Sequence, residues 1–471
     1  MIPTRRRAGD SAGGALRLRH PLDREILALA VPALGALAAD PLVSMVDTAF
    51  VGRLGVTPLG ALGVNASVFS LAFVVFNFLA YGTTPMIARA VGRGDRGRAG
   101  RLAVEALTLA GIAGAVALVL LQLLAEPILS VMGAVGELRE PALAYLRIRA
   151  LAGPAVLLVT AGHGIFRGWQ DTRTPLLVTL GLNAVNLVLD PLLIFGFGWG
   201  LEGAAIATAL AQWSGAAAFL WLILVGRRKS LGVGRGYRPR PADLLPFLRV
   251  GGALLTRTLA LIGTMTLATA VATRLGTAAV AAHQVASQLW LLLALVVDAL
   301  AVAGQAMVAR YRAGGEGREG DGAARRALLG HGRPDGAGPP GVGPTAREVA
   351  DRLLAWGLVV GLVLAGGFLL LRPWLPLLFT SDPTALSRVG SLLPFVIWMQ
   401  PLNALVFVWD GIFMGAEAFR YLAVQMVLSA GAAAAVLLLV VPLGWGLAGV
   451  WWGLVALMAG RGVTLAVRYW R

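Results

Sequence analysis

The sequence contains no cysteine, four histidines and few charged residues. Without cysteine the chain can form no disulfide, no thiolate metal site and no cysteine nucleophile. No two of the histidines are spaced as a metal-binding pair on a helix; they are His20, His163, His283 and His331. Only 14% of the residues are charged and 58% are hydrophobic, whereas a soluble globular domain carries about 25% charged residues. This composition excludes an ordinary cytosolic enzyme.

The hydrophobic residues occur in blocks of about 20, the length of a helix that crosses a bilayer. The blocks predict an all-α membrane protein with twelve transmembrane helices. These spans run at about 26–50, 59–82, 102–125, 141–163, 175–197, 202–226, 246–272, 278–306, 351–374, 390–414, 421–442 and 447–468. The first block is too long for a signal-peptide core and has no convincing cleavage site, so it is interpreted as a span.

The formal net charge is +16, and its distribution predicts the topology. With both termini in the cytoplasm, most of the 40 Lys and Arg residues fall in cytoplasmic segments or in the helix ends next to them. The basic residues in outward-facing segments are Arg53, Arg139, Arg274, Arg372 and Arg388. We therefore expect a multi-pass protein of the plasma (inner) membrane, whose basic surface faces anionic lipid head groups rather than nucleic acid.

Short motifs recur in the two halves of the chain. The tripeptide at 53–55 recurs at 274–276, and the tetrapeptide at 86–89 recurs in similar form at 307–310, both at an offset of 221. The tripeptides at 164–166 and 199–201 recur at 411–413 and 445–447, at offsets of 247 and 246. The repeats predict two six-helix lobes in parallel orientation, a pattern typical of transporters.

The predicted organisation follows from these repeats. We expect a basic cytoplasmic tail over 1–25, an N-lobe over 26–226, a cytoplasmic linker over 227–245 and a C-lobe over 246–471. The offset between the repeats increases from 221 to about 247 along the chain. The increase falls where the second half carries a stretch rich in Gly, Arg and Pro, at about 313–348. Its composition predicts a disordered cytoplasmic loop within the C-lobe.

Charged side chains inside spans are costly and are therefore candidates for function. Asp47 lies near the outer end of the first span and Asp190 near that of the fifth, while Thr208 lies near the start of the sixth. At 1.5 Å per residue all three lie roughly 7–11 Å below the outer rim. Together with Asn186, one turn before Asp190, they could form one polar pocket suited to proton or sodium coupling.

Structural interpretations of the same residues remain open. Asp47 could be solvated at the interface, Asp190 could pin a helix, and the amide and hydroxyl could serve packing alone. Asp40 could titrate in a water-filled cavity or stabilise a kink at the following proline. Three prolines are candidates for helix bending, because proline removes a helical hydrogen bond; they are Pro32, Pro41 and Pro191.

Other residues inside the spans are candidates for a substrate cavity. Its apolar lining could include aromatic side chains, although most membrane aromatics pack or anchor at interfaces. The candidates are Phe69, Phe73, Phe76, Tyr81, Trp213 and Trp290. Arg257 is the main cation near the middle of a span, where it could neutralise Asp298 or Asp410 or contact an anionic substrate.

Several of these segments resemble a known family. Residues 40–55, with the sequence DPLVSMVDTAFVGRLG, are similar to the first span of the multidrug and toxic compound extrusion (MATE) family, and most similar to its DinF-like branch. The segments at 164–172 and 183–208 resemble the family's spans four to six, and those at 281–285 and 410–415 resemble its C-terminal half. The resemblance covers nearly the whole chain.

The resemblance implies a V-shaped antiporter that exports organic compounds by alternating access. It maps the family's N-lobe cation site onto Asp47, Asn186, Asp190 and Thr208. The C-lobe carboxylates of another branch have no clear counterpart, which favours the N-lobe. We expect H+ as coupling ion, with Na+ on the same four residues as the alternative, and no further cofactor. The expected partners are a small organic substrate and the lipid bilayer, and the expected state is a monomer.

Two further transport functions remain as alternatives. An exporter of citrate-like organic anions would use cavity arginines such as Arg257. A flippase of lipid-linked precursors would need a large cavity rich in arginine, which the spans do not offer. A membrane-embedded hydrolase or transferase is disfavoured, because the sequence shows no clustered nucleophile, histidine or metal set.

Overall fold

The structure is a computed structural model that describes residues 20–234, 236–328, 344–375 and 383–471. Within these residues the chain forms helices and no strands. Ten helices are long and apolar enough to cross a membrane, or up to 12 if each of two bent helix pairs is one span. The all-α membrane fold expected from the sequence is confirmed.

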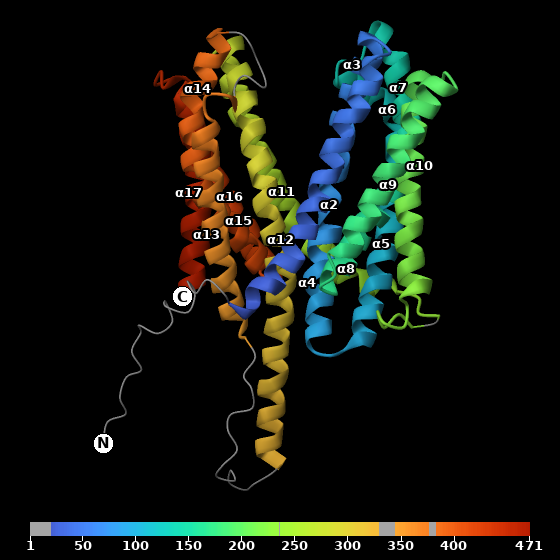
Figure 1. Cartoon of the computed structure of the whole chain (residues 1–471), viewed down its shortest axis with the longest axis vertical. Coiled ribbons are helices and arrows are strands. Elements are labelled where there is room, and N and C mark those ends of the chain that lie inside the picture. Colours follow the sequence, from blue (N-terminus) through green and yellow to red (C-terminus); the bar gives the residue numbers. More distant parts are fainter. Residues whose placement is uncertain (1–19, 235, 329–343, 376–382) are drawn as a thin grey trace. The chain divides into compact units, whose positions relative to one another are not determined.

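The helices follow one another with short connections (Figure 1). The first half comprises α2 Pro21–Gly52, α3 Val56–Val74, η1 Val75–Asn77, α4 Phe78–Gly92, α5 Arg96–Leu123, α6 Ala125–Val131, η2 Gly136–Leu138, α7 Arg139–Ala150, α8 Gly153–Gly168, α9 Arg173–Pro191, η3 Leu192–Gly196, α10 Gly200–Trp221 and η4 Leu222–Gly226. The second comprises α11 Pro241–Arg274, α12 Thr277–Leu328, α13 Ala346–Leu371, α14 Pro383–Trp398, α15 Gln400–Gly415, α16 Phe419–Val440 and α17 Gly446–Trp470.

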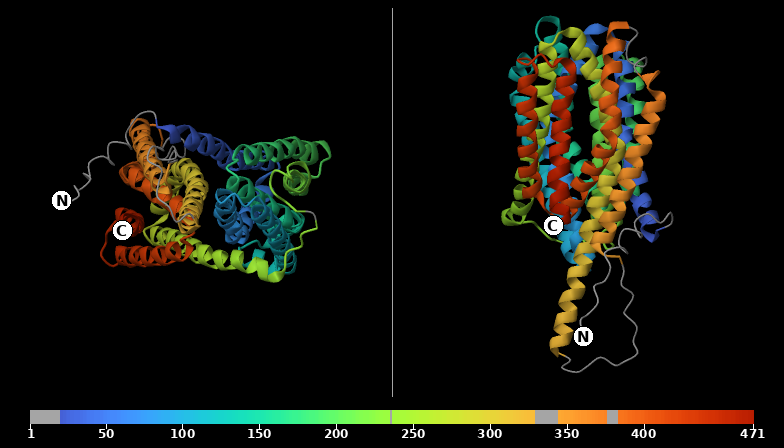
Figure 2. Two further views of the ribbon diagram at one scale, coloured as in Figure 1. Left: turned by 90° about the horizontal axis from the view of Figure 1, so that it is seen from below. Right: turned by 90° about the vertical axis from the view of Figure 1, so that its left-hand side faces the viewer.

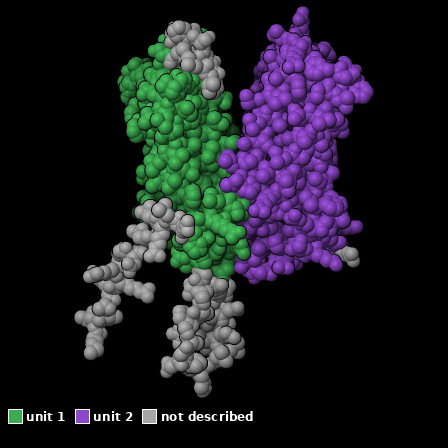
Figure 3. Space-filling model, viewed as in Figure 1, with its two compact units in different colours: residues 1–30, 253–471 green, residues 31–252 purple. Residues whose placement is uncertain are grey.

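The chain forms two compact units (Figure 3). Unit 1 contains Met1–Ala30 and Ala253–Arg471, and unit 2 contains Val31–Gly252. The boundaries fall inside α2 and α11 rather than in the basic linker. The start of α2 belongs to unit 1 because Asp23 binds Arg352 there, accepting hydrogen bonds from Nε at 2.6 Å and Nη2 at 2.7 Å.

The linker between η4 and α11 is anchored to unit 2. The Tyr237 hydroxyl donates a hydrogen bond to the Glu105 carboxylate of α5 at 2.7 Å. Burial, together with this carboxylate, raises the pKa of Tyr237 to about 12, so the phenol stays protonated as the donor. This contact, with the first turns of α11, extends unit 2 beyond the predicted lobe boundary at residue 226.

The segment predicted as a disordered loop at about 313–348 is helical over its first part. Helix α12 continues to Leu328, and α13 begins at Ala346. Residues 329–343 lie outside the described part of the chain. Adding a residue to an existing helix is much easier than nucleating one, and Ala, Arg and Glu alternate with glycine beyond residue 313, so α12 propagates past the apolar span.

The two units contain the same close helix contacts at the offsets of the sequence repeat. In unit 2, α8 packs on α4, where a Cβ at Gly164 would lie 2.9 Å from the Ala80 carbonyl oxygen. In unit 1, α15 packs on α12, where a Cβ at Gly411 would overlap the Ala301 carbonyl oxygen. The backbone conformation after these two helices is also the same. Gln170 lies two residues after the end of α8 and Glu417 two residues after the end of α15, and their φ angles are 62° and 58°.

The Gly411→Ala substitution should therefore destabilise the protein. The added methyl group meets backbone rather than a flexible side chain, and overpacking of this kind costs about 1–3 kcal/mol. Gly431→Ala on α16 is the matched control, because no atom lies within 4 Å of its Cβ position. Thermal unfolding of the purified protein in detergent would compare the two. Equal melting temperatures would contradict the tight contact between α12 and α15.

Candidate functional site

Two carboxyl groups from different helices face one another in unit 2. Asp47 of α2 is half-buried, and Asp190 of α9 is 0% exposed. The two groups are close enough to share a hydrogen bond. Among the described residues, however, none donates to Asp47 Oδ1 or to either oxygen of Asp190. Unscreened carboxylates repel in a low-dielectric site, so the pair requires a proton or a cation between its oxygens.

The other two residues of the predicted pocket differ in their placement. Asn186 is buried beside Asp190, and its Nδ2 has no hydrogen-bond acceptor among the described residues. Thr208 is half-buried on α10, and its hydroxyl donates to the Ala204 carbonyl at 2.8 Å. The structure thus brings Asp47, Asn186 and Asp190 together, while the recorded bond of Thr208 is made within its own helix.

The end of α9 shapes the site locally. Pro191 follows Asp190 directly and is the last α-helical residue, after which the backbone widens into the π-helical turn η3. Proline cannot donate the helical hydrogen bond, and π-helical turns are frequent at functional sites. Pro32 and Pro41, by contrast, lie inside the continuous helix α2.

Asp40 forms a second polar contact between the same two helices. The Asn183 amide donates a hydrogen bond to Asp40 Oδ1 at 3.0 Å. Asn183 is buried, whereas the Asp40 side chain is exposed. Helices α2 and α9 therefore contact one another through two polar pairs, Asp40–Asn183 and Asp47–Asp190. In the first pair, Asn183 donates a hydrogen bond to the carboxylate.

Arg149 is a member of the site that the sequence analysis missed. It lies near the end of α7, beside Tyr145 and within electrostatic range of Asp47. Its guanidinium carbon lies 5.1 Å from the centre of the Phe69 ring, at a distance typical of a cation–π contact. Its position inside the fourth predicted span could have marked Arg149 as a functional candidate, because charged side chains within spans are costly. Arg149 supplies a positive charge next to the carboxyl pair.

The predicted cavity aromatics have different surroundings. Phe69, Phe73 and Phe76 form a row of contacting rings in unit 2, with centroids 5.8 and 6.4 Å apart. The Trp213 indole donates to the Leu151 carbonyl at the break between α7 and α8, at 3.2 Å. Trp290 belongs to unit 1, where it is 9% exposed within the core. A role in substrate binding stays a prediction for all of them.

Unit 1 contains a buried cluster of one carboxylate and two guanidinium groups. Arg257 Nη2 and Arg461 Nη2 both donate to Oδ2 of Asp410, the first at 2.6 Å. Arg461 and Asp410 are buried, with side chains 1% and 2% exposed. Asp410, one of the two partners considered for Arg257 from the sequence, thus binds it in the structure. Arg461 was counted only as a residue of a cytoplasmic helix end, and its pairing was not foreseen.

The polar residues that α2 and α9 bring together in unit 2 have apolar counterparts in unit 1. At the repeat offsets of 221 and 247, Asp40 and Asn183 correspond to Leu261 and Ala430, which pack together in one hydrophobic cluster. The position equivalent to Asp47 is the buried Ala268. The position equivalent to Asp190 is the buried Leu437, so within the described residues the repeat shares helix contacts between the units while the carboxyl pair lies in unit 2.

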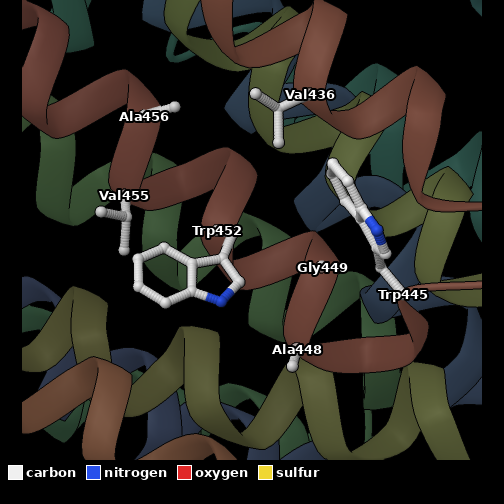
Figure 4. Close-up of a pocket in the computed structure, with 7 residues that line it drawn as sticks. All are labelled: Val436, Trp445, Ala448, Gly449, Trp452, Val455 and Ala456. Atoms are coloured by element: carbon white, nitrogen blue, oxygen red, sulfur yellow. The ribbon is translucent and has the colours of Figure 1, made fainter. Parts of the chain in front are cut away.

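Two pockets open on the helix surfaces of the units. In unit 1, a pocket of about 630 Å³ lies between α16 and α17 and is lined by apolar residues (Figure 4). Trp445 and Trp452 flank it, and Gly449 leaves room between them. In unit 2, a groove lies between α9 and α10, which pack side by side (Figure 1 and Figure 2). Neither is lined by the predicted cavity aromatics.

A duplicated set of membrane-spanning helices, with facing carboxyl groups in one of the two repeats, defines a secondary transporter. The chain belongs to the MatE family, which it matches over residues 32–192 and 344–440. It is thus a multidrug and toxic compound efflux transporter of the MATE class, and not an enzyme.

Individual relatives support this assignment. The chain is 35% identical to Protein DETOXIFICATION 44, chloroplastic, of Arabidopsis thaliana, over 94% of this chain and 81% of that protein. It is 28% identical to DNA damage-inducible protein F of Escherichia coli, over 95% and 93%. A crystal structure of MATE in the bent conformation shares the fold, with a TM-score of 0.80, 23% identity and coverage of 97% and 96%.

Proposed function

We propose that the protein is an H+-coupled antiporter that exports organic compounds across the plasma membrane by alternating access. The observation that carries the proposal is the Asp47–Asp190 pair, in which Asp47 Oδ1 and both oxygens of Asp190 have no donor among the described residues. A site of this kind binds a cation or a proton far more strongly than an isolated surface carboxylate does. Both termini are placed in the cytoplasm by the distribution of Lys and Arg.

The coupling residues have distinct roles in this mechanism. Protonation of the pair from the outer side removes the repulsion between α2 and α9, so the helices close around the polar pocket. Helix α2 then bends at Pro41, where the helical hydrogen bond is missing. This bending releases the substrate outward. Arg149 opposes protonation of Asp47, and so helps the pair to release its protons to the cytoplasm.

Sodium is the alternative coupling ion at the same site. Carboxylate, amide and hydroxyl oxygens are the ligands that hard cations prefer. Asp47, Asn186, Asp190 and Thr208 offer this set, and the Thr208 oxygen keeps a lone pair while its proton is donated to Ala204. When bound, Na+ would neutralise the two carboxylates as protons do.

Transport by reconstituted protein tests the proposal. Proteoliposomes holding a fluorescent organic cation would receive a proton gradient or a sodium gradient separately. We expect the proton gradient to drive substrate movement by the wild type, and Asp47→Asn to abolish it because the pair can no longer exchange a proton. Glu202→Gln, which changes an exposed carboxylate of the same unit, is the matched control.

The outcomes separate the candidate functions. Sodium-driven movement lost in Asp47→Asn would keep the site and replace the ion. Full proton-driven export by Asp47→Asn would refute the proposed coupling site. Movement of citrate rather than an organic cation would support the second candidate, an organic-anion exporter, which is favoured by the two guanidinium groups on Asp410 in unit 1.

A further inference from the structure

The groove between α9 and α10 differs at its two ends. It has a volume of about 390 Å³. Most of its lining is apolar, with Leu177, Val178 and Leu182 on α9 and Ala218 on α10. At one end the lining changes to Thr174 and Arg227, where Arg227 Nη1 donates to Thr174 Oγ1 at 3.1 Å. Apart from Ser214, the groove is therefore apolar along its length, and it is polar and charged at this end.

The polar end carries excess positive charge. Arg173 begins α9, and Arg227, Arg228 and Lys229 follow η4 directly. Asp171 neutralises part of this charge, because its Oδ2 accepts a hydrogen bond from Arg227 at 2.8 Å. Arg227 is the basic residue that lines the groove, and the other three basic residues lie within two positions of Thr174 or Arg227 in the sequence. Against one carboxylate they give this end of α9 and η4 a net positive charge, which attracts an anion and repels an organic cation.

The dimensions of the groove match one acyl chain. From Thr174 to Val185 along α9, the lining extends over about 16 Å at 1.5 Å per residue. This is about half of the ~30 Å hydrocarbon core, the depth of one leaflet. Leu177, in the lining, is 68% exposed on unit 2, as expected for a groove that opens toward lipid. The basic end then lies at the membrane surface.

We propose that this groove is a binding site for an anionic phospholipid. One acyl chain lies along α9 and α10, and the phosphate contacts the basic residues at the polar end. The pocket between α16 and α17 has no such specificity, because no charged side chain lines it. The inference is independent of the ion that drives transport.

Native mass spectrometry of the full chain in detergent tests the proposal. Phosphatidylglycerol and phosphatidylcholine would be added separately at equal concentrations. We expect selective retention of phosphatidylglycerol by the wild type. Gly181→Leu should abolish it, because Gly181 lines the groove and has no atom within 4 Å of its Cβ position, so leucine fills the groove without a clash. Gly431→Leu on α16 is the matched control, since its Cβ position is equally open.

A variant that removes a basic side chain tests the role of charge without changing the shape of the groove. Arg173→Gln should weaken phosphatidylglycerol retention about five-fold, because one basic side chain near a membrane surface contributes about that factor to anionic lipid binding. Equal retention of both lipids, or unchanged retention by Gly181→Leu, would overturn the proposal. Displacement of the lipid by the transported organic cation would also overturn it and assign the groove to substrate.

Discussion

Replacing Asp190 by asparagine should stabilise the protein while abolishing its transport. The side chain is fully buried, and neither of its oxygens has a donor among the described residues. The asparagine amide would donate to Asp47 and remove the repulsion between the two carboxylates. An unsatisfied buried polar group costs about 1–3 kcal/mol, so we expect a gain of that order in the free energy of unfolding.

Unfolding and transport have to be measured on the same preparation. Thermal unfolding in detergent should show a higher melting temperature for Asp190→Asn than for the wild type at neutral pH. Proteoliposomes made from the variant should show no gradient-driven export. Glu202→Gln should alter neither quantity, because that carboxylate is exposed. A loss of stability in Asp190→Asn would show that Asp190 pins α9 rather than carrying the coupling charge.

Replacing Asp410 by asparagine should have the opposite effect on stability. Asp410 is the acceptor for both Arg257 and Arg461 in unit 1, and Arg461 is 1% exposed. Removal of one partner from a buried ion pair leaves an uncompensated charge, which costs about 3–5 kcal/mol. Thermal unfolding should therefore show a large decrease in the melting temperature.

Two further variants test whether the loss of stability comes from the broken Asp410 ion pairs or from the loss of any carboxylate charge. The triple variant Arg257→Met/Asp410→Leu/Arg461→Met should recover much of the lost stability, because apolar replacement of a complete buried ion cluster is often neutral. Glu126→Gln, which removes a half-exposed pair with Arg139, should change stability by less than about 1 kcal/mol. Equal losses for Asp410→Asn and Glu126→Gln would contradict a buried, mutually dependent cluster.

The carboxyl pair was accessible from the sequence because depth in a membrane is almost one-dimensional. Counting residues from the end of each span placed Asp47 and Asp190 at the same level, and the structure brings them together. The two bent helix pairs also fall on predicted spans, Gly136–Ala150 with Gly153–Gly168 and Ser387–Trp398 with Gln400–Gly415. Length and hydropathy were sufficient for these features.

The rotation of each helix about its own axis could not be predicted from the sequence in the same way. Depth alone does not say which side of α7 or α17 faces a neighbour, so Arg149 and Arg461 went without assigned partners. Asp410 and Arg461 are 51 positions apart in the chain, and no local pattern relates them. Composition also predicted disorder from residue 313 where α12 continues to Leu328, because glycine content favours disorder while a helix already formed propagates.

In the proposed mechanism, the apolar residues at the unit 1 counterparts of Asp47 and Asp190 limit the number of protons that drive export. Among the described residues the facing carboxyl pair lies in unit 2, so a cycle coupled through this pair moves at most two protons. At about 2.3 kcal/mol per charge per 100 mV, two protons supply roughly 4.6 kcal/mol at that potential. A neutral compound could then be concentrated outside by about three orders of magnitude. The counterparts of Asp47 and Asp190 in unit 1 are Ala268 and Leu437, so carboxyl groups at these two positions would supply a second pair for steeper gradients.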